Sequence, residues 1–188
     1  MLSWISQILF AAIISLPIVL LGQGETSKKF RCQNAKINFI SEAQLELIKA
    51  SSNAGLGLID PASNHFAFSV EVQTFQGFNS ALQREHFNEK YMESETFPKA
   101  VFTGKIIEQV DLTKDGTYDV RAKGDLDIHG IKQTRIIKAQ VIVRSGVAKV
   151  LSSFTVPLAD HNISVPTLVN QKIASQILVE FDAALTLR

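Results

Sequence analysis

The side chains that most readily bind metals or take part in catalysis are few in this chain: His65, His86, His129, His161 and Cys32. The best spacing for a metal site lies in a predicted helix, where Glu85-His86 is followed by Glu89 and Glu93. Side chains three or four residues apart share one face of a helix and can converge on a cation. A solvated, charged helix face explains the same residues more simply. We therefore predict no metal site.

Hydrolytic and nucleotide chemistry have no matching motif. A catalytic triad needs a nucleophile, a base and an orienting acid. The chain has no Gly-x-Ser-x-Gly segment, and Ser152-Ser153 lie within a strand pattern. Its glycines form neither a dinucleotide-binding fingerprint nor a phosphate loop. We predict that the protein is not an enzyme and has no catalytic residues.

His129-Gly130 is the one polar pair with two competing interpretations. In the functional one, His129 contacts a ligand at the rim of a barrel. In the structural one, which we favour, His129 lies on the solvated face of a strand and Gly130 supplies a turn or bulge.

Composition predicts a single globular domain. The chain has 188 residues, of which 46% are hydrophobic and 20% charged, with a formal net charge of +1. These values are typical of a folded domain rather than a disordered one. The near-zero charge and the absence of a basic cluster argue against nucleic-acid binding.

The first 24 residues differ from the rest and are predicted to be a signal peptide. Residues 8–21 are apolar apart from Ser15 and Pro17, Gly22 and Gly24 supply small residues before a cleavage site, and the first ionisable side chain is Glu25. An uncleaved anchor is the alternative, although the run is shorter than the ~20 residues of a spanning helix. We expect a periplasmic or secreted domain over 25–188, with no membrane-spanning segment after cleavage.

Cys32 is the only cysteine, so the domain has no intramolecular disulfide. The preceding Lys29-Phe30-Arg31 is charged and bulky, unlike the small apolar residues before a lipidated cysteine. We predict an unpaired, structural thiol.

The segment 118–129 has the clearest strand pattern. Its even positions are apolar or glycine, from Tyr118 to Ile128, and its odd positions are polar, from Asp119 to His129. Side chains alternate faces along a strand, so this pattern predicts an antiparallel sheet with one dry and one solvated face.

Further strands are predicted at 35–41, 45–50, 66–72, 100–108, 135–144, 147–158 and 176–188, with turns at 51–55 and 60–64. Residues 80–92 break the alternation and predict a short helix, N-capped by Ser80, that lays Leu82, Phe87 and Tyr91 over one end of the sheet. About eight short strands predict an all-β sandwich or barrel.

Three motifs, in order, resemble the YceI-like family of polyisoprenoid-binding, lipocalin-like periplasmic proteins: 85–94 (EHFNEKYMES), 97–104 (FPKAVFTG) and 124–130 (GDLDIHG). The resemblance covers roughly 35–187. It implies an eight-stranded antiparallel barrel with a short helix over one end, whose lumen holds an isoprenoid chain, such as a quinone tail, or a similar lipid. It implies no catalysis and no other cofactor.

The inward faces of the predicted strands supply the candidate lumen residues, which we expect to contact the lipid: Phe66, Phe68, Val70, Val72, Phe102, Tyr118, Val120, Leu126, Ile128, Phe154, Val179 and Phe181. The Tyr118 hydroxyl is a candidate partner for a head group or for a core group. An eight-stranded barrel either fills its interior with side chains or holds one ligand.

The alternative function is therefore a closed barrel that acts through its outer face as an interaction or stress-response protein, without a lipid. Small lumen side chains would favour a ligand, and interdigitating phenylalanines, of which the chain has 12, would favour closure. The sequence does not say which phenylalanines face inward, and it leaves a homodimer open.

Overall fold

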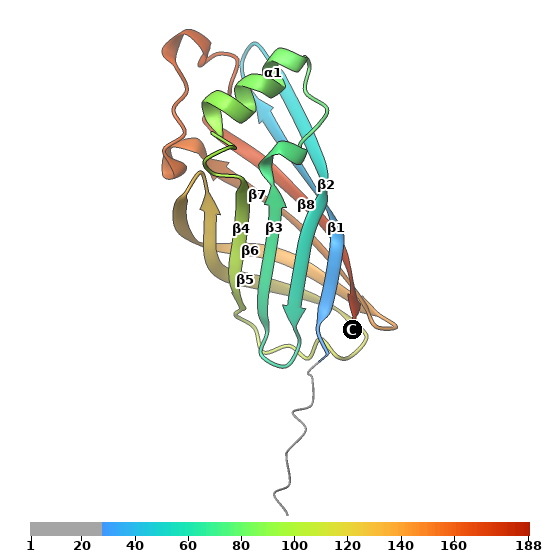
Figure 1. Cartoon of the computed structure of the whole chain (residues 1–188). Coiled ribbons are helices and arrows are strands. Elements are labelled where there is room, and N and C mark those ends of the chain that lie inside the picture. Colours follow the sequence, from blue (N-terminus) through green and yellow to red (C-terminus); the bar gives the residue numbers. More distant parts are fainter. Residues whose placement is uncertain (1–27) are drawn as a thin grey trace, which may run out of the picture.

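The computed structural model describes residues 28–188, and the predicted signal peptide lies outside them. Eight strands follow one another along the described chain (Figure 1). They are β1 (Phe30–Glu42), β2 (Leu47–Asp60), β3 (His65–Glu71), β4 (Lys99–Ile106), β5 (Gly116–Ile128), β6 (Ile131–Arg144), β7 (Val147–Pro157) and β8 (Gln176–Leu187).

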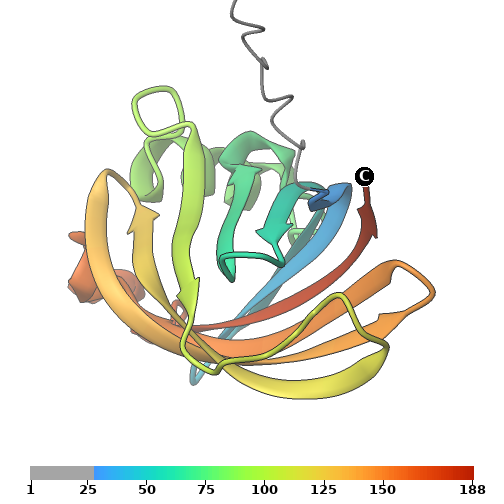
Figure 2. The same cartoon turned by 90° about the horizontal axis from the view of Figure 1, so that it is seen from below.

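Each strand pairs antiparallel with the next, and β1 pairs with β8, so the sheet closes into a barrel. Figure 2 shows the strands encircling a common interior when the molecule is viewed from below. The closed, eight-stranded antiparallel barrel predicted from the sequence is confirmed. Every described strand thus has a neighbour on both sides, although the β6–β7 ladder covers only Ala139–Arg144 and Val147–Ser152.

The alternation that defines β5 has the predicted faces. Val120 and Leu126 are buried, whereas Asp119, Arg121 and Asp125 are exposed. His129 is not on this solvated face. It follows the strand, adopts a positive φ of 54° and forms the tight β5–β6 turn with Gly130, which also has a positive φ. The structural interpretation correctly predicted a turn at Gly130, but it wrongly placed His129 on the solvated face of the strand.

The turn predicted at 51–55 is wrong, because β2 runs through it without a break. The chain reverses earlier, at Ala43–Glu46, where Ala43 N donates to Glu46 O at 3.0 Å. Residues 51–55 instead lie opposite a register shift in β1 between Cys32 and Ile37. The bulge changes which residues face inward, and Ser-Ser-Asn-Ala-Gly, although typical of a turn, fits this irregular pairing.

The lower half of the barrel is largely filled by side chains. Its buried core brings together side chains from both ends of the chain, including Phe30, Ile59, Val141 and Leu185. Leu112, in the β4–β5 connection, is fully buried in this core and closes the lower end. The hydrophobic interior at this end therefore holds the fold together and has no room for a long ligand.

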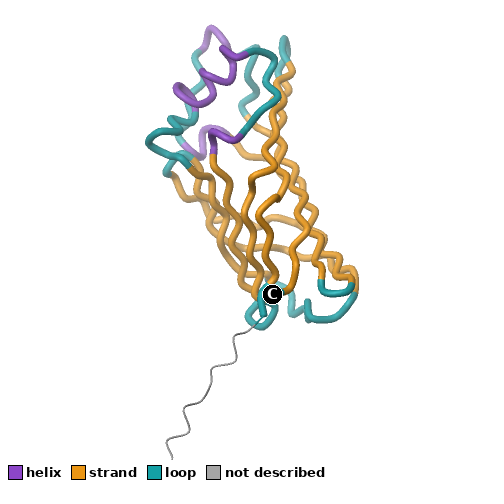
Figure 3. Tube along the Cα trace, turned by 45° about the vertical axis from the view of Figure 1, so that its right-hand side comes forward, coloured by secondary structure: helices purple, strands orange, loops and turns teal. Residues whose placement is uncertain are grey.

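A helical cap covers the other end (Figure 3). It comprises a 3-10 turn at Val72–Thr74, helix α1 at Ala81–His86 and a π-helical turn at Phe87–Tyr91. The Ser80 side chain accepts a hydrogen bond from Gln83 N at 3.1 Å, so the predicted N-cap is confirmed. The connection from β7 to β8 lies at the same end and holds two further 3-10 turns, Leu158–His161 and Thr167–Val169.

None of the helices in residues 28–188 has the length and apolar character required to cross a membrane.

Candidate functional site: an apolar cavity under the helical cap

A cavity of about 490 Å³ occupies the upper half of the barrel, between the packed lower core and the helical cap. Its walls come from the inward faces of the strands and from the cap and the β7–β8 connection. Nine of the predicted lumen residues line it: Phe68, Val70, Val72, Phe102, Leu126, Ile128, Phe154, Val179 and Phe181.

The other three predicted residues lie lower. Phe66 and Val120 line a second space of about 100 Å³ beneath the first, which Phe68, Phe102, Phe154 and Phe181 also border. Tyr118 lines neither space. Its hydroxyl donates to Asp111 O and Lys114 O, both at 3.0 Å, in the β4–β5 connection. This connection lies at the lower end of the barrel, away from the upper cavity. The head-group role considered for Tyr118 is therefore wrong.

A layer of phenylalanines forms the floor of the cavity. The ring centroids of Phe66 and Phe102 lie 4.9 Å apart, and those of Phe68 and Phe181 also 4.9 Å. These tilted and edge-on arrangements are favourable for aromatic pairs. Apart from the small second space, side chains thus fill the lower barrel, whereas the upper part is hollow.

A second aromatic cluster forms the wall beneath the cap. Phe39, Phe75 and Phe78 surround Phe87, with centroids 5.1 to 6.0 Å from the Phe87 ring. Phe87 thereby joins the cap to the barrel, as predicted, and Tyr91 lines the cavity. Leu82 does not pack down. Its side chain is 57% exposed, contrary to the prediction.

The polar groups of the cavity are gathered at its upper end. Gln83 Nε2 donates to Glu46 Oε1, which joins α1 to the β1–β2 turn. Ser41 Oγ accepts from Ala174 N at 2.9 Å, and Lys172 lies on the lining without an ion pair among the described residues. An apolar chain in the cavity would therefore have its polar end among these groups.

His129 ties the β5–β6 turn to the cap. Its Nε2 lies 3.2 Å from Glu93 Oε1, and its Nδ1 lies 3.1 Å from the carbonyl oxygen of His161. The Phe97 ring packs edge-on against the imidazole, with centroids 4.7 Å apart. This arrangement gives His129 a structural role beside the cavity, whose lining does not include it.

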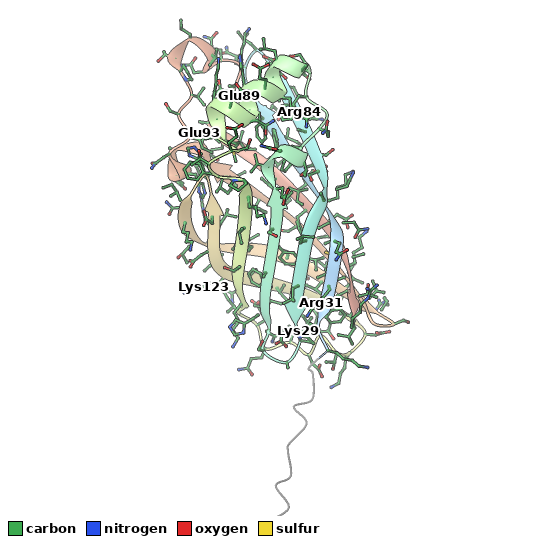
Figure 4. The ribbon with its side chains drawn as sticks, viewed as in Figure 1. Lys29, Arg31, Arg84, Glu89, Glu93 and Lys123 are labelled. Carbon is green, nitrogen blue, oxygen red and sulfur yellow. The ribbon has the colours of Figure 1, made fainter. Side chains whose placement is uncertain are left out.

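The metal spacing noted on the predicted helix does not form a site. His86 Nε2 lies 3.2 Å from Lys90 Nζ, and Glu93 faces His129. Figure 4 shows Glu89 and Glu93 on the cap. Among residues 28–188, no three His, Cys, Asp or Glu side chains gather in a group suited to a metal ion.

Sequence reasoning missed several residues of the lining. Ile37 and Phe39 alternate with Lys36 and Asn38 in a predicted strand, so the signal for them was present. Others lie in irregular segments that have no periodicity: Phe75, Phe78, Ile163, Val169 and Ile173.

The volume sets the size of a guest. Sites for small molecules typically measure roughly 300–1,000 Å³, and this cavity of about 490 Å³ lies within that range. At roughly 15 to 30 Å³ for each water-sized group, it has room for on the order of 16 to 33 carbon atoms, or about three to six isoprene units. A longer chain would extend through the upper end.

Comparison with known proteins agrees with this architecture. A family model described as YceI-like domain matches residues 25–185, almost the whole chain. No curated protein matches the chain.

Several solved structures have a similar fold. A polyisoprenoid binding domain from Saccharophagus degradans, implicated in plant cell wall breakdown, is 17% identical with a TM-score of 0.70, covering 86% of this chain and 99% of that one. Burkholderia cenocepacia BcnA is 16% identical with a TM-score of 0.66, covering 81% and 96%. The Campylobacter jejuni YCEI protein is 14% identical with a TM-score of 0.56, covering 72% and 80%. At these identities the likeness shows a shared fold.

Proposed function

The chain belongs to the YceI-like domain family, and we propose that it is an exported binding protein that holds the chain of an isoprenoid or similar lipid in its barrel. The observation that carries the proposal is the cavity of about 490 Å³ lined almost wholly by hydrophobic side chains. The Saccharophagus degradans domain of similar fold is described as polyisoprenoid binding, which supports the same class of ligand.

The chemistry of the lining favours a long apolar chain over a compact polar molecule. Most of its lining consists of apolar side chains such as phenylalanine, isoleucine and valine, which offer no hydrogen bonds to a polar ligand. At roughly 0.3 kcal/mol for each heavy atom, a guest of 16 to 33 atoms would bind with about 5 to 10 kcal/mol. That range brackets a micromolar dissociation constant, at about 8 kcal/mol.

Selectivity for chain length should be low. An apolar wall distinguishes two chains by only about 1 to 3 kcal/mol for each methylene. The polar groups at the upper end, Glu46, Gln83 and Lys172, are better placed to select a head group. We therefore propose a class of ligand, an isoprenoid, a quinone or a comparable lipid, rather than one molecule.

Export is part of the proposal and rests on the apolar segment of residues 8–21. The domain would then work in the periplasm or outside the cell. The alternative, a closed barrel without a lipid, accounts for the largely filled lower half but not for the upper cavity. We propose a binding role and no catalytic one.

The test is to purify the protein from an exporting host without detergent, extract it with organic solvent and analyse the extract by mass spectrometry. We expect about one lipid with a long apolar chain for each protein molecule. An extract without such a lipid, followed by failure of the protein to take up an added polyisoprenoid, would overturn the proposal. Native mass spectrometry of the same protein before extraction reports both signal cleavage and any homodimer.

A further inference from the structure

Exposed leucines gather at the capped end of the barrel. Eight large hydrophobic side chains are exposed in the described chain, and four of them are leucines at this end. Their exposed fractions are 64% for Leu45, 47% for Leu47, 57% for Leu82 and 97% for Leu168. Single exposed leucines are ordinary, but a group of them on one part of a surface marks an interaction site. We name these four residues the leucine rim.

The leucine rim is one connected structure, although its members come from three segments. Leu45 N donates to Gln171 O at 2.8 Å, which joins the β1–β2 turn to the segment that carries Leu168. Asn79 Nδ2 donates to Leu47 O at 3.0 Å, which joins the same turn to the start of α1. The leucines are therefore held in fixed relation to one another.

The leucine rim lies at the same end as chain segments that line the cavity. Each of its members is next in sequence to a lining residue: Glu46 lies between Leu45 and Leu47, Gln83 follows Leu82, and Val169 follows Leu168. The cavity and the exposed leucines thus lie toward the same end of the molecule, where α1 and the β7–β8 connection are both found (Figures 1 and 3).

We propose that the leucine rim docks the capped end of the barrel onto the surface of a lipid bilayer, so that a lipid chain passes between bilayer and cavity without crossing water. The inference rests on the proposed function, because a long isoprenoid resides in a membrane before it reaches a binding protein. Exposed leucines at one end of a molecule suit shallow insertion among lipid chains, where binding strength grows with the apolar area buried.

The charge of this end selects the kind of bilayer. Segments 43–47, 77–95 and 158–175 hold six acidic and three basic side chains, the basic ones being Arg84, Lys90 and Lys172. An excess of acidic groups gives no attraction to anionic lipids. Docking should therefore depend on the leucines rather than on charge, and a zwitterionic surface should suffice.

The test is flotation of the purified protein with phosphatidylcholine vesicles. The rim variant Leu45→Asp/Leu168→Asp is compared with a matched control, Leu56→Asp/Ile136→Asp, whose leucine and isoleucine are exposed on β2 and β6. We expect the wild type and the control to float, and the rim variant to lose at least tenfold in vesicle binding. About 0.5 M salt, which screens charges beyond a few Å, should leave the binding unchanged.

A second measurement separates this inference from the proposed function. Loading with a polyisoprenoid delivered in detergent reports the cavity alone, and the rim variant should load as the wild type does. Failure of loading in every protein would count against the proposed function. The docking proposal would be overturned if all three proteins loaded normally but none bound vesicles. It would also be overturned if all three loaded normally and bound vesicles equally well. Light scattering gives a second way to overturn it. If the wild type and the control were dimers and the rim variant a monomer, the leucine rim would contact a second copy of the chain instead of a bilayer.

Discussion

Gly104 on β4 and Gly124 on β5 lie directly opposite each other, and the two strands approach so closely there that neither position has room for a side chain. A Cβ added to Gly104 would lie 2.5 Å from Gly124 Cα and closer still to the carbonyl oxygen of Lys123. These glycines belong to two of the motifs on which the family resemblance rested. Their pairing gives those motifs a physical reason, the close approach of two backbones in the barrel wall.

This pairing predicts that Gly124→Val destabilises the barrel severely. The atoms a valine side chain would meet are backbone, which moves only with the whole strand. We expect a loss of more than about 3 kcal/mol in the free energy of unfolding, measured by urea denaturation, or failure to fold. Lys123→Val, at the exposed neighbouring position, is the control and should change it by less than about 0.5 kcal/mol. Equal stability of the two variants would show that the strands can separate at no cost.

Leu112 should be the most sensitive residue of the connections. It is fully buried in the lower core, although it lies outside every strand. We expect Leu112→Ala to lower the free energy of unfolding by about 2 to 5 kcal/mol, through lost burial and the cavity left behind. Leu56→Ala, at a half-exposed position, is the comparison and should lie within about 0.5 kcal/mol of the wild type. A similar small change for Leu112→Ala would contradict the closed lower end.

Cys32 should react slowly with thiol reagents in the native protein. Burial raises the pKa of its thiol, an effect partly offset by backbone N–H groups of Asn34, Ala35 and Gly57. The thiolate is the reactive form, so a raised pKa and burial both slow alkylation. We expect iodoacetamide to label the folded protein at least about a hundredfold more slowly than the chain in denaturant. The native rate should rise with pH well beyond pH 8.5, the ordinary thiol pKa. Labelling at the unfolded rate would place Cys32 outside the core.

The sequence supported the fold more fully than the site. Alternation in β5 and β8 identified the inward faces, since period-two patterns survive wherever one face is buried. It failed at the β1–β2 bulge, where turn-like residues sit inside a continuous strand. Alternation also misplaced Tyr118. It correctly predicted that the Tyr118 side chain faces inward, but a period-two pattern does not say how far along the barrel axis that side chain lies.

The upper wall was the least accessible to sequence reasoning. Phe75 and Phe78 lie between β3 and α1 in a segment with no regular period, and only the folded chain brings them against Phe39 and Phe87. The same holds for Ile163 and Ile173 in the β7–β8 connection. Where irregular segments form part of a cavity wall, no periodic pattern in the sequence identifies the residues that line it.

The most direct test of the account is whether filling the cavity removes lipid binding while the fold persists. Val179 lines the cavity on β8, and Ala184 on the same strand is exposed. Native mass spectrometry after incubation with a polyisoprenoid should show one lipid for each molecule of wild type and of Ala184→Trp. Val179→Trp should bind at least tenfold more weakly, with a melting temperature within a few degrees of the wild type. Undiminished loading of Val179→Trp, or no loading of the wild type, would contradict a lipid-binding cavity in the upper barrel.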